Sequence, residues 1–195
     1  MNGLKPNLAE KQFLRIGYQR FFDLYTEIET KAFWRKSAQY RFHCIRDIFA
    51  IYNELICCQE LNQMPVKQKK IHPAVSDKLF RFVRHLLAHF PFFTTWDSVW
   101  INKELATWSQ RGQIDKYLEE VDGQHPVTLQ FRDPMRPKQN INVAINFPAD
   151  YALNKSVYLK DILSEHEGVR FSIGRMLLTL LQISNAAELL MNPGS

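Results

Sequence analysis

The feature that most constrains this chain is a short stretch, residues 76–91, whose apolar and cationic side chains separate onto two sides of a predicted helix. At about 100° per residue, its large apolar side chains gather on one side and predict a face that packs in a core. They are Leu79, Val83, Leu86, Leu87 and Phe90, flanked by Phe80 and Phe82. Pro91 ends the helix, because proline lacks an N–H and its ring disfavours helical backbone in the preceding residue.

The opposite side of this predicted helix is cationic. It carries Arg81, Arg84, His85 and His89 around Ala88, a residue small enough to let another group come close. Arg84 and His89 stand about 140° apart on a regular helix, so their side chains do not meet easily. If they cooperate, a long arginine, a distorted last turn or a second chain must bring them together.

Composition limits the class of protein. The chain has 195 residues, of which 46% are hydrophobic, and this length suits one domain with a substantial core. No apolar run approaches the roughly 18 residues of a membrane span. The N-terminus lacks the charged-then-apolar order of a secretion signal, so we expect a cytoplasmic protein with no membrane partner. The net charge of +5 permits an acidic partner such as RNA without requiring one.

Two long helical patterns precede the central helix, from about residue 7 to 30 and from about residue 33 to 63. Helices of this length joined by a short break predict the beginning of an antiparallel bundle. Between them and the central helix, residues 64–73 contain two prolines and three lysines and therefore predict a loop. Lys67, Lys69 and Lys70 are its candidate phosphate contacts.

After Pro91, Thr94 and Asp97 have the spacing of a capping box and predict the start of a helix that continues towards Gly112. Trp96, Trp100 and Trp108 follow at near-helical spacing. Such spacing favours packing in the core over stacking on nucleic-acid bases.

From residue 126 the period changes to strict alternation, which predicts two strands over residues 127–131 and 141–147. Their connection, residues 133–140, predicts a long β-hairpin with a basic tip, where Arg136 and Lys138 are further candidate RNA contacts. A further helical segment is expected over residues 156–163. Ser164 and Glu167 then have capping-box spacing and begin a long apolar helix, which we expect to lie in the bundle or at a dimer interface.

The segment from Arg84 to His89 reads Arg-His-Leu-Leu-Ala-His and resembles the Rx4-6H motif of the HEPN superfamily, in which a polar residue follows the arginine and an alanine precedes the histidine. HEPN proteins are helical bundles that carry this motif late in their third or fourth helix. The resemblance covers roughly the first 120 residues and implies a HEPN-like helical bundle over residues 1–122. It does not cover the rest, for which the sequence patterns predict an added β-hairpin over 123–150 and C-terminal helices over 151–195 that pack on the bundle, so that the whole is mainly α and one compact domain.

The resemblance also implies a function, metal-independent endoribonuclease activity at a site shared by two subunits, as in toxins and phage-defence effectors. Arg84 and His89 match the catalytic positions, with His85 and Arg81 in support and no cofactor. A guanidinium can hold a phosphate in bidentate fashion, and an imidazole can move the proton of a ribose 2′-hydroxyl. The implied partners are RNA, a second copy of the chain, and an antitoxin or a nucleotidyltransferase-type protein. Pro91 occupies the place where some toxins carry a modifiable tyrosine, which speaks against that form of neutralisation.

Three alternatives stay open at the level of sequence. A HEPN-like module can bind RNA, a nucleotide or a partner protein without cleaving. His85 and His89, four residues apart on one helix face, have the spacing of a helical metal site, but no third ligand accompanies them and the nearby arginines repel cations. The chain can also be an ordinary helical domain whose basic strip is merely solvated.

Overall fold

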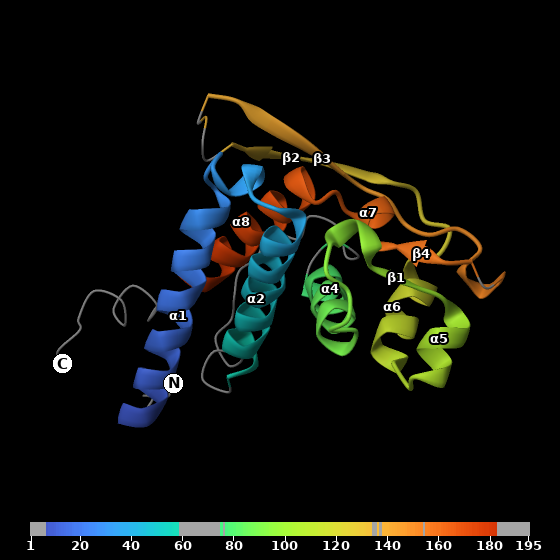
Figure 1. The fold of residues 1–195 in the computed structure, drawn as a ribbon, viewed down its shortest axis with the longest axis horizontal. Coiled ribbons are helices and arrows are strands. Elements are labelled where there is room, and N and C mark those ends of the chain that lie inside the picture. The colour runs from blue at the N-terminus through green and yellow to red at the C-terminus, as the bar shows by residue number, and fades with distance from the viewer. Residues whose placement is uncertain are drawn as a thin grey trace.

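Helices packed side by side form the body of the protein, and α4 lies in the middle of the row (Figure 1). The computed structural model describes residues 7–58, 75, 77–133, 136, 138–153 and 155–182. In chain order the elements are α1 (Leu8–Ile28), η1 (Phe33–Arg35), α2 (Ala38–Cys57), α4 (Asp77–His89), η3 (Trp96–Ser98), β1 (Trp100–Ile101), α5 (Lys103–Trp108), α6 (Gly112–Val121), β2 (Val127–Arg132), β3 (Asn140–Ile145), η4 (Tyr151–Leu153), β4 (Val157–Tyr158), α7 (Leu159–Ile162) and α8 (His166–Gln182). This confirms the predicted mainly α fold with a β-hairpin.

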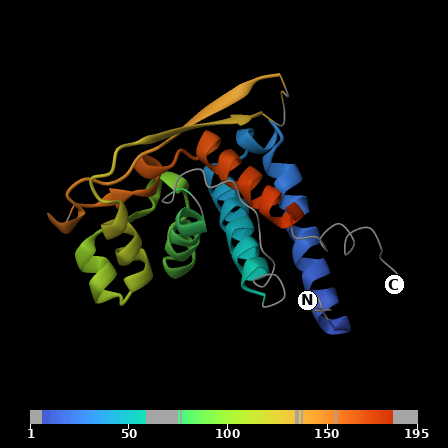
Figure 2. The same ribbon diagram turned by 180° about the vertical axis from the view of Figure 1, so that it is seen from behind.

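The row runs α1, α2, α4, α6, with each helix packed against the next and α5 against α6. Viewed from behind, α8 crosses α1 and α2 (Figure 2). One continuous hydrophobic core includes Leu14 of α1, Val143 of β3 and Leu180 of α8. Within the described residues, no helix combines the length and the apolar character that a bilayer crossing needs.

The helix starts follow from capping residues. Asn7 accepts a hydrogen bond from the Glu10 backbone N–H at 3.0 Å, while the Glu10 carboxylate accepts one from the Asn7 N–H at 2.6 Å. This reciprocal capping satisfies donors that the first turn of α1 leaves free. Ser37 caps α2 by a single bond, because its hydroxyl accepts a hydrogen bond from the Tyr40 N–H. The second long helix therefore begins at Ala38, later than the predicted residue 33, and the residues before it form the short η1.

The prediction of a helix after Pro91 is wrong for the first half of that segment. Thr95 and Ser98 form hydrogen bonds with each other at the N-terminal cap of η3. This helix has one turn, and Trp100 then lies in a short strand. That strand, β1, pairs antiparallel with β4. The strand β4 lies at the start of residues 156–163, where the sequence predicts a helix. Only the four residues of α7 in that segment are helical. Two-residue strands carry too little periodicity to be recognised by pattern.

The tryptophans also differ from the prediction. Trp96 is buried and donates its indole N–H to the carbonyl oxygen of Leu163 at 2.9 Å, as core packing requires. Trp100 is half-buried. Trp108, at the end of α5, is 81% exposed and belongs to no core.

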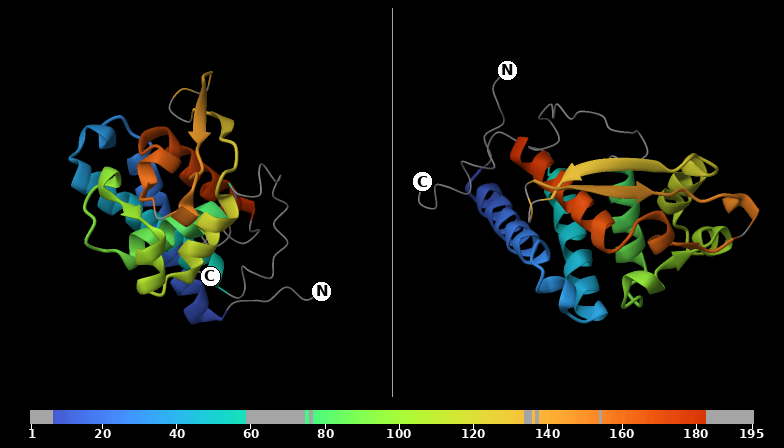
Figure 3. Two further views of the ribbon diagram at one scale, coloured as in Figure 1. Left: turned by 90° about the vertical axis from the view of Figure 1, so that its right-hand side faces the viewer. Right: turned by 90° about the horizontal axis from the view of Figure 1, so that it is seen from above.

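The predicted β-hairpin forms, and its register runs from Val127 opposite Ile145 to Arg132 opposite Asn140. Seen from above, the hairpin crosses α8 (Figure 3), against which β3 packs. The ring of Phe131 meets that of Phe171 on α8, with centroids 5.8 Å apart. A hairpin alone is marginal in water, and α8 supplies the apolar surface that it needs. The α8 helix begins as predicted beside Ser164, whose hydroxyl accepts a hydrogen bond from the Gly168 N–H.

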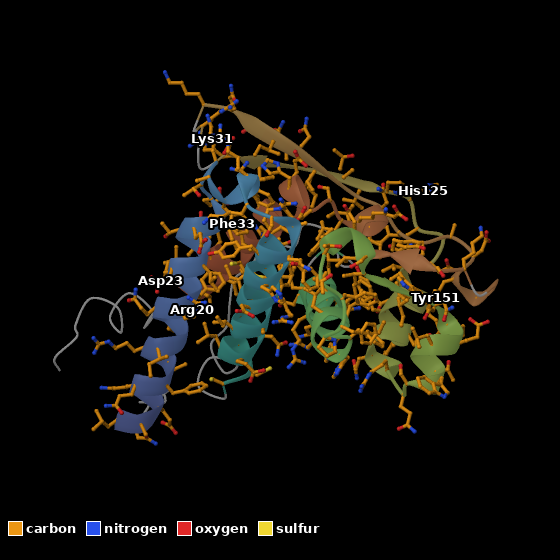
Figure 4. The ribbon with its side chains drawn as sticks, in the orientation of Figure 1. Arg20, Asp23, Lys31, Phe33, His125 and Tyr151 are labelled. Carbon is orange, nitrogen blue, oxygen red and sulfur yellow. The ribbon has the colours of Figure 1, made fainter. Side chains whose placement is uncertain are left out.

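After the hairpin the chain returns to α6 through Tyr151, which lies beside α5 and α6 (Figure 4). Its hydroxyl donates to Asp115 at 2.9 Å, and its backbone N–H donates to Asp122 at 3.1 Å. Both carboxylates belong to α6 or its C-terminal cap. These contacts hold α6 in the position from which it packs against α4.

A buried ion cluster joins the hairpin to the bundle. Arg170 of α8 is 2% exposed and donates two hydrogen bonds to one oxygen of Glu29, at 2.9 and 3.2 Å. It also donates to Asp133, which follows β2. Burial raises the pKa of the Glu29 carboxyl, and its bonds to Arg170 oppose that change. Glu29 caps α1, so a single guanidinium connects α1, the hairpin and α8.

Replacing this arginine tests the cluster. Arg170→Met should lower the free energy of unfolding by about 3–5 kcal/mol, because two buried carboxylates lose their counter-charge. Lys155→Met is the matched control, since it removes the exposed pair with Asp150 and should cost at most about 1 kcal/mol. Urea denaturation measures both, and similar losses in the two variants would contradict a special role for the cluster.

Candidate functional site

The predicted cationic side of α4 is enclosed more than the sequence indicates. The helix packs against α2 on one side and α6 on the other, so Arg84, His85 and His89 are half-buried, while Arg81 and Ala88 are exposed. The apolar side is core as predicted, with Leu79, Val83 and Leu86 at most 1% exposed.

Four side chains form a continuous polar row at this place. Arg84 donates from Nη2 to Glu54 of α2 at 3.3 Å, and its Nη1 lies 3.4 Å from His85 Nδ1. His85 Nδ1 in turn lies 3.2 Å from His89 Nε2. The two imidazole rings are nearly parallel, with an interplanar angle of 15° and centroids 5.4 Å apart. His85 thus connects Arg84 to His89 within one chain, across the 140° that separates them on a regular helix.

The donors and acceptors in this row restrict the histidine tautomers. A guanidinium only donates, so its contact is a hydrogen bond when His85 Nδ1 carries a lone pair. When His89 Nε2 carries a hydrogen, that hydrogen shares the same single lone pair in a bifurcated contact. This assignment leaves the Nδ1 lone pair of His89 as the basic nitrogen of the pair.

The surroundings of both imidazoles favour the neutral form. Burial lowers the pKa of His85, and the positive charges of Arg84, of His89 when it is protonated, and of Arg81 lower it further. Burial also lowers the pKa of His89, together with Arg111 and Arg84. A neutral imidazole is the state that can accept a proton at neutral pH.

A small hollow of about 100 Å³ opens beside the two histidines. Its other wall is the turn between α5 and α6, where Gln110 adopts a positive φ of 56° and Arg111 follows. Among the described residues, the buried Nε atoms of Arg84 and Arg111 have no hydrogen-bond partner. Two guanidinium groups therefore lie near the histidine pair, one from α4 and one from the turn between α5 and α6.

The structure does not bring every predicted site residue to this place. The hairpin lies on the side of the molecule opposite the α5–α6 turn (Figures 1 and 3), so its tip, with Arg136 and Lys138, is remote from His89. Arg136 and Lys138 are both exposed. Lys67, Lys69 and Lys70, with the predicted loop over 64–73, lie outside the described residues.

Two site residues escaped the sequence analysis. Glu54 is one of several acidic residues on α2, and nothing in its spacing points to Arg84, which lies 30 positions further along the chain. Arg111 stands beside Gly112, at a break that predicts a turn and no chemistry. Only helix packing brings them to α4.

The described residues around the histidine pair do not support a metal site. In the part of the chain that the structure describes, no three His, Cys, Asp or Glu side chains gather as a metal would need. Arg84 and Arg111 also place positive charge beside the imidazoles.

The sequence matches no protein-family model, and neither a curated protein nor a solved structure matches it. The resemblance to HEPN proteins therefore rests on the motif in α4, and family membership stays a prediction.

The pKa shifts can be tested residue by residue. Both histidines should titrate below the ordinary value of 6.5, followed by NMR of their Cε1–H groups. Arg111→Gln should raise the pKa of His89 more than that of His85, and Arg81→Gln should do the reverse, so each variant is the control for the other. As the pH falls, the two histidines bind protons at a higher pH in the unfolded chain than in the folded protein. The free energy of unfolding should therefore decrease as the pH drops below 6.5. Equal shifts of both histidines in both variants would contradict the arrangement described.

Proposed function

We propose that this protein is a metal-independent endoribonuclease in which Arg84 and His89 carry the chemistry. The observation that supports the proposal most is the row from Glu54 through Arg84 and His85 to His89, with surroundings that favour the neutral form of both imidazoles. It places a phosphate-binding cation and a basic nitrogen within one connected unit.

The reaction that suits these groups is internal transfer at an RNA phosphate. His89 Nδ1 accepts the proton of a ribose 2′-hydroxyl, and the 2′-oxygen attacks the adjacent phosphorus. The bond from phosphorus to the 5′-oxygen of the next nucleotide breaks, which leaves a 2′,3′-cyclic phosphate and a 5′-hydroxyl end protonated by water. Arg84 stabilises the charge that grows on the non-bridging oxygens.

The neighbouring residues support these two. His85 acts as a positioning residue, because its Nδ1 lies within hydrogen-bond distance of both Arg84 and His89 and so contacts both side chains. Arg81 is exposed and lies one turn earlier on α4, where it adds positive potential without touching the row. The resemblance to HEPN proteins places such an activity in a toxin or a phage-defence effector, with an antitoxin or a nucleotidyltransferase-type protein as partner.

A second candidate function is binding without cleavage, by a module that recognises RNA, a nucleotide or a protein. The observation that favours it is the contact from Arg84 to Glu54, because a carboxylate already occupies donors that a scissile phosphate would need. In the ribonuclease proposal, the phosphate displaces Glu54, which is itself exposed and can move into water.

The first test is cleavage of single-stranded RNA in the presence of EDTA. Wild-type protein should cut, and Arg84→Ala or His89→Ala should each slow cutting by about 10² or more. His85→Ala should have a smaller effect. His43→Ala is the control, because this exposed histidine on α2 lies outside the row and its replacement should leave the rate unchanged. Circular dichroism checks that every variant is folded.

The outcomes separate the alternatives. Full cleavage by Arg84→Ala protein would falsify the proposed mechanism. Retained RNA binding by a wild type that never cuts would support the non-catalytic module. Loss of cutting in EDTA, and in each histidine variant alike, would point to a metal held by His85 and His89.

We also predict a homodimer, as the HEPN resemblance implies. Most of α8 is core, but Leu178 and Leu181 remain 49% and 51% exposed on it, and Ala88 is exposed on α4. Light scattering at tens of micromolar should report twice the chain mass of 23.0 kDa. A monomer that still cuts RNA would show that the row acts within a single chain, without a shared site.

A further inference from the structure

A second, larger hollow lies beside the candidate catalytic row. It has a volume of about 720 Å³ and is walled by α2, α4 and α6. Pockets that enclose small molecules commonly measure about 300–1,000 Å³. Arg84 and His85 line it, and His85 also lines the small hollow beside His89, so the two hollows meet at the catalytic row.

The wall of this hollow has an excess of positive charge. Cations come from Lys78, Arg81 and Arg84 on α4 and from Lys116 on α6, against the two carboxylates of Glu54 and Glu120. Lys78 pairs with Glu120, and Arg84 with Glu54. Arg81 and Lys116 are exposed, and neither has a carboxylate within 4.0 Å among the residues that the structure describes. These two charges are therefore available to an anion.

The cations of α4 form a line that leads towards the row. Lys78, Arg81 and Arg84 are spaced by three residues, which places them as neighbours along one side of the helix and spans about 9 Å of its axis. Lys116 faces this line from α6. An extended polyanion can follow such a line, whereas an isolated phosphate can use only part of it.

Two aromatic side chains line the hollow, and both are nearly buried: Phe82 is 2% exposed and Tyr117 is 5% exposed. Phe82 stacks on Tyr117, with ring centroids 4.6 Å apart and an interplanar angle of 22°. Asn53 of α2, which is 8% exposed, adds an amide to the wall. Apolar surface with a convergent amide and cations above it suits a ligand that has a flat heterocycle and a phosphate.

We infer that this hollow binds the nucleotide next to the scissile phosphate in a single-stranded RNA, with Arg81 and Lys116 on its phosphate. The inference rests on the proposed ribonuclease function and names a substrate subsite for it. It makes Arg81 a substrate-binding residue and adds Lys116, Asn53 and the Phe82–Tyr117 pair to the site.

The test uses a ligand that cannot be cleaved, so that it reports on the subsite alone. Adenosine 3′,5′-bisphosphate is titrated calorimetrically into His89→Ala protein, with inorganic phosphate as the comparison ligand. Binding of the bisphosphate should be at least about tenfold tighter than that of phosphate, because the base and a second phosphate add contacts. Adding Arg81→Gln and Lys116→Gln should weaken it at least about tenfold.

The matched control adds Lys155→Gln and Lys160→Gln instead, which remove the same formal charge from exposed positions outside the hollow. This control should keep the affinity of its His89→Ala parent. Equal weakening by both pairs of substitutions would show that net charge alone acts, and equal affinity for phosphate and bisphosphate would show an anion site with no nucleotide specificity. Either result overturns the inference.

The same variants separate this inference from the ribonuclease proposal. Bisphosphate binding that depends on Arg81 and Lys116, in a protein whose wild type never cuts RNA, would reject the ribonuclease and keep the subsite as a nucleotide site. Conversely, cutting by wild type with an unchanged KM for a short RNA in the Arg81→Gln, Lys116→Gln protein would reject the subsite and keep the ribonuclease.

Discussion

The site depends on α4 being fixed between two neighbouring helices. Phe80 meets Phe49 and Tyr52 of α2, with centroids 6.4 and 6.2 Å away, and Phe82 stacks on Tyr117 of α6. These contacts fix the rotation of α4, so its cationic side must face the seams between helices rather than open water. Half-burial then restricts Arg84 to the row and favours the neutral form of both histidines. One packing arrangement thus produces both the geometry and the electrostatics of the site.

The hairpin and the site use separate parts of the molecule. Arg170, a single buried cation, connects the hairpin to α1 and α8 on the side remote from the α5–α6 turn. After the hairpin, however, Tyr151 returns the chain to α6 and bonds Asp115. The hairpin therefore affects the site through the placement of α6, one wall of both hollows, and its basic tip is distant from the row.

Much of the fold could be predicted because its signals are local. The apolar periods of α1, α2 and α4, the alternation in the hairpin and the cap at Ser164 each act within a few residues of chain. Prediction failed where partners are remote: β1 forms only because β4, more than fifty residues later, pairs with it. Trp108 followed the helical period and yet lies exposed, because α5 ends there and no neighbouring element covers it among the described residues.

By itself the sequence determined that α4 is a helix ending before Pro91, that its apolar side is core, and that Arg81, Arg84, His85 and His89 share its other side. Those properties follow from backbone sterics and the helical period, which depend on neighbouring residues alone. Only the tertiary structure decided that Glu54 pairs with Arg84, that Arg111 lowers the pKa of His89, and that α6 encloses the hollow lined by Lys116. These depend on packing between distant segments, since burial and Coulomb interactions are set by distance in space and not by distance along the chain.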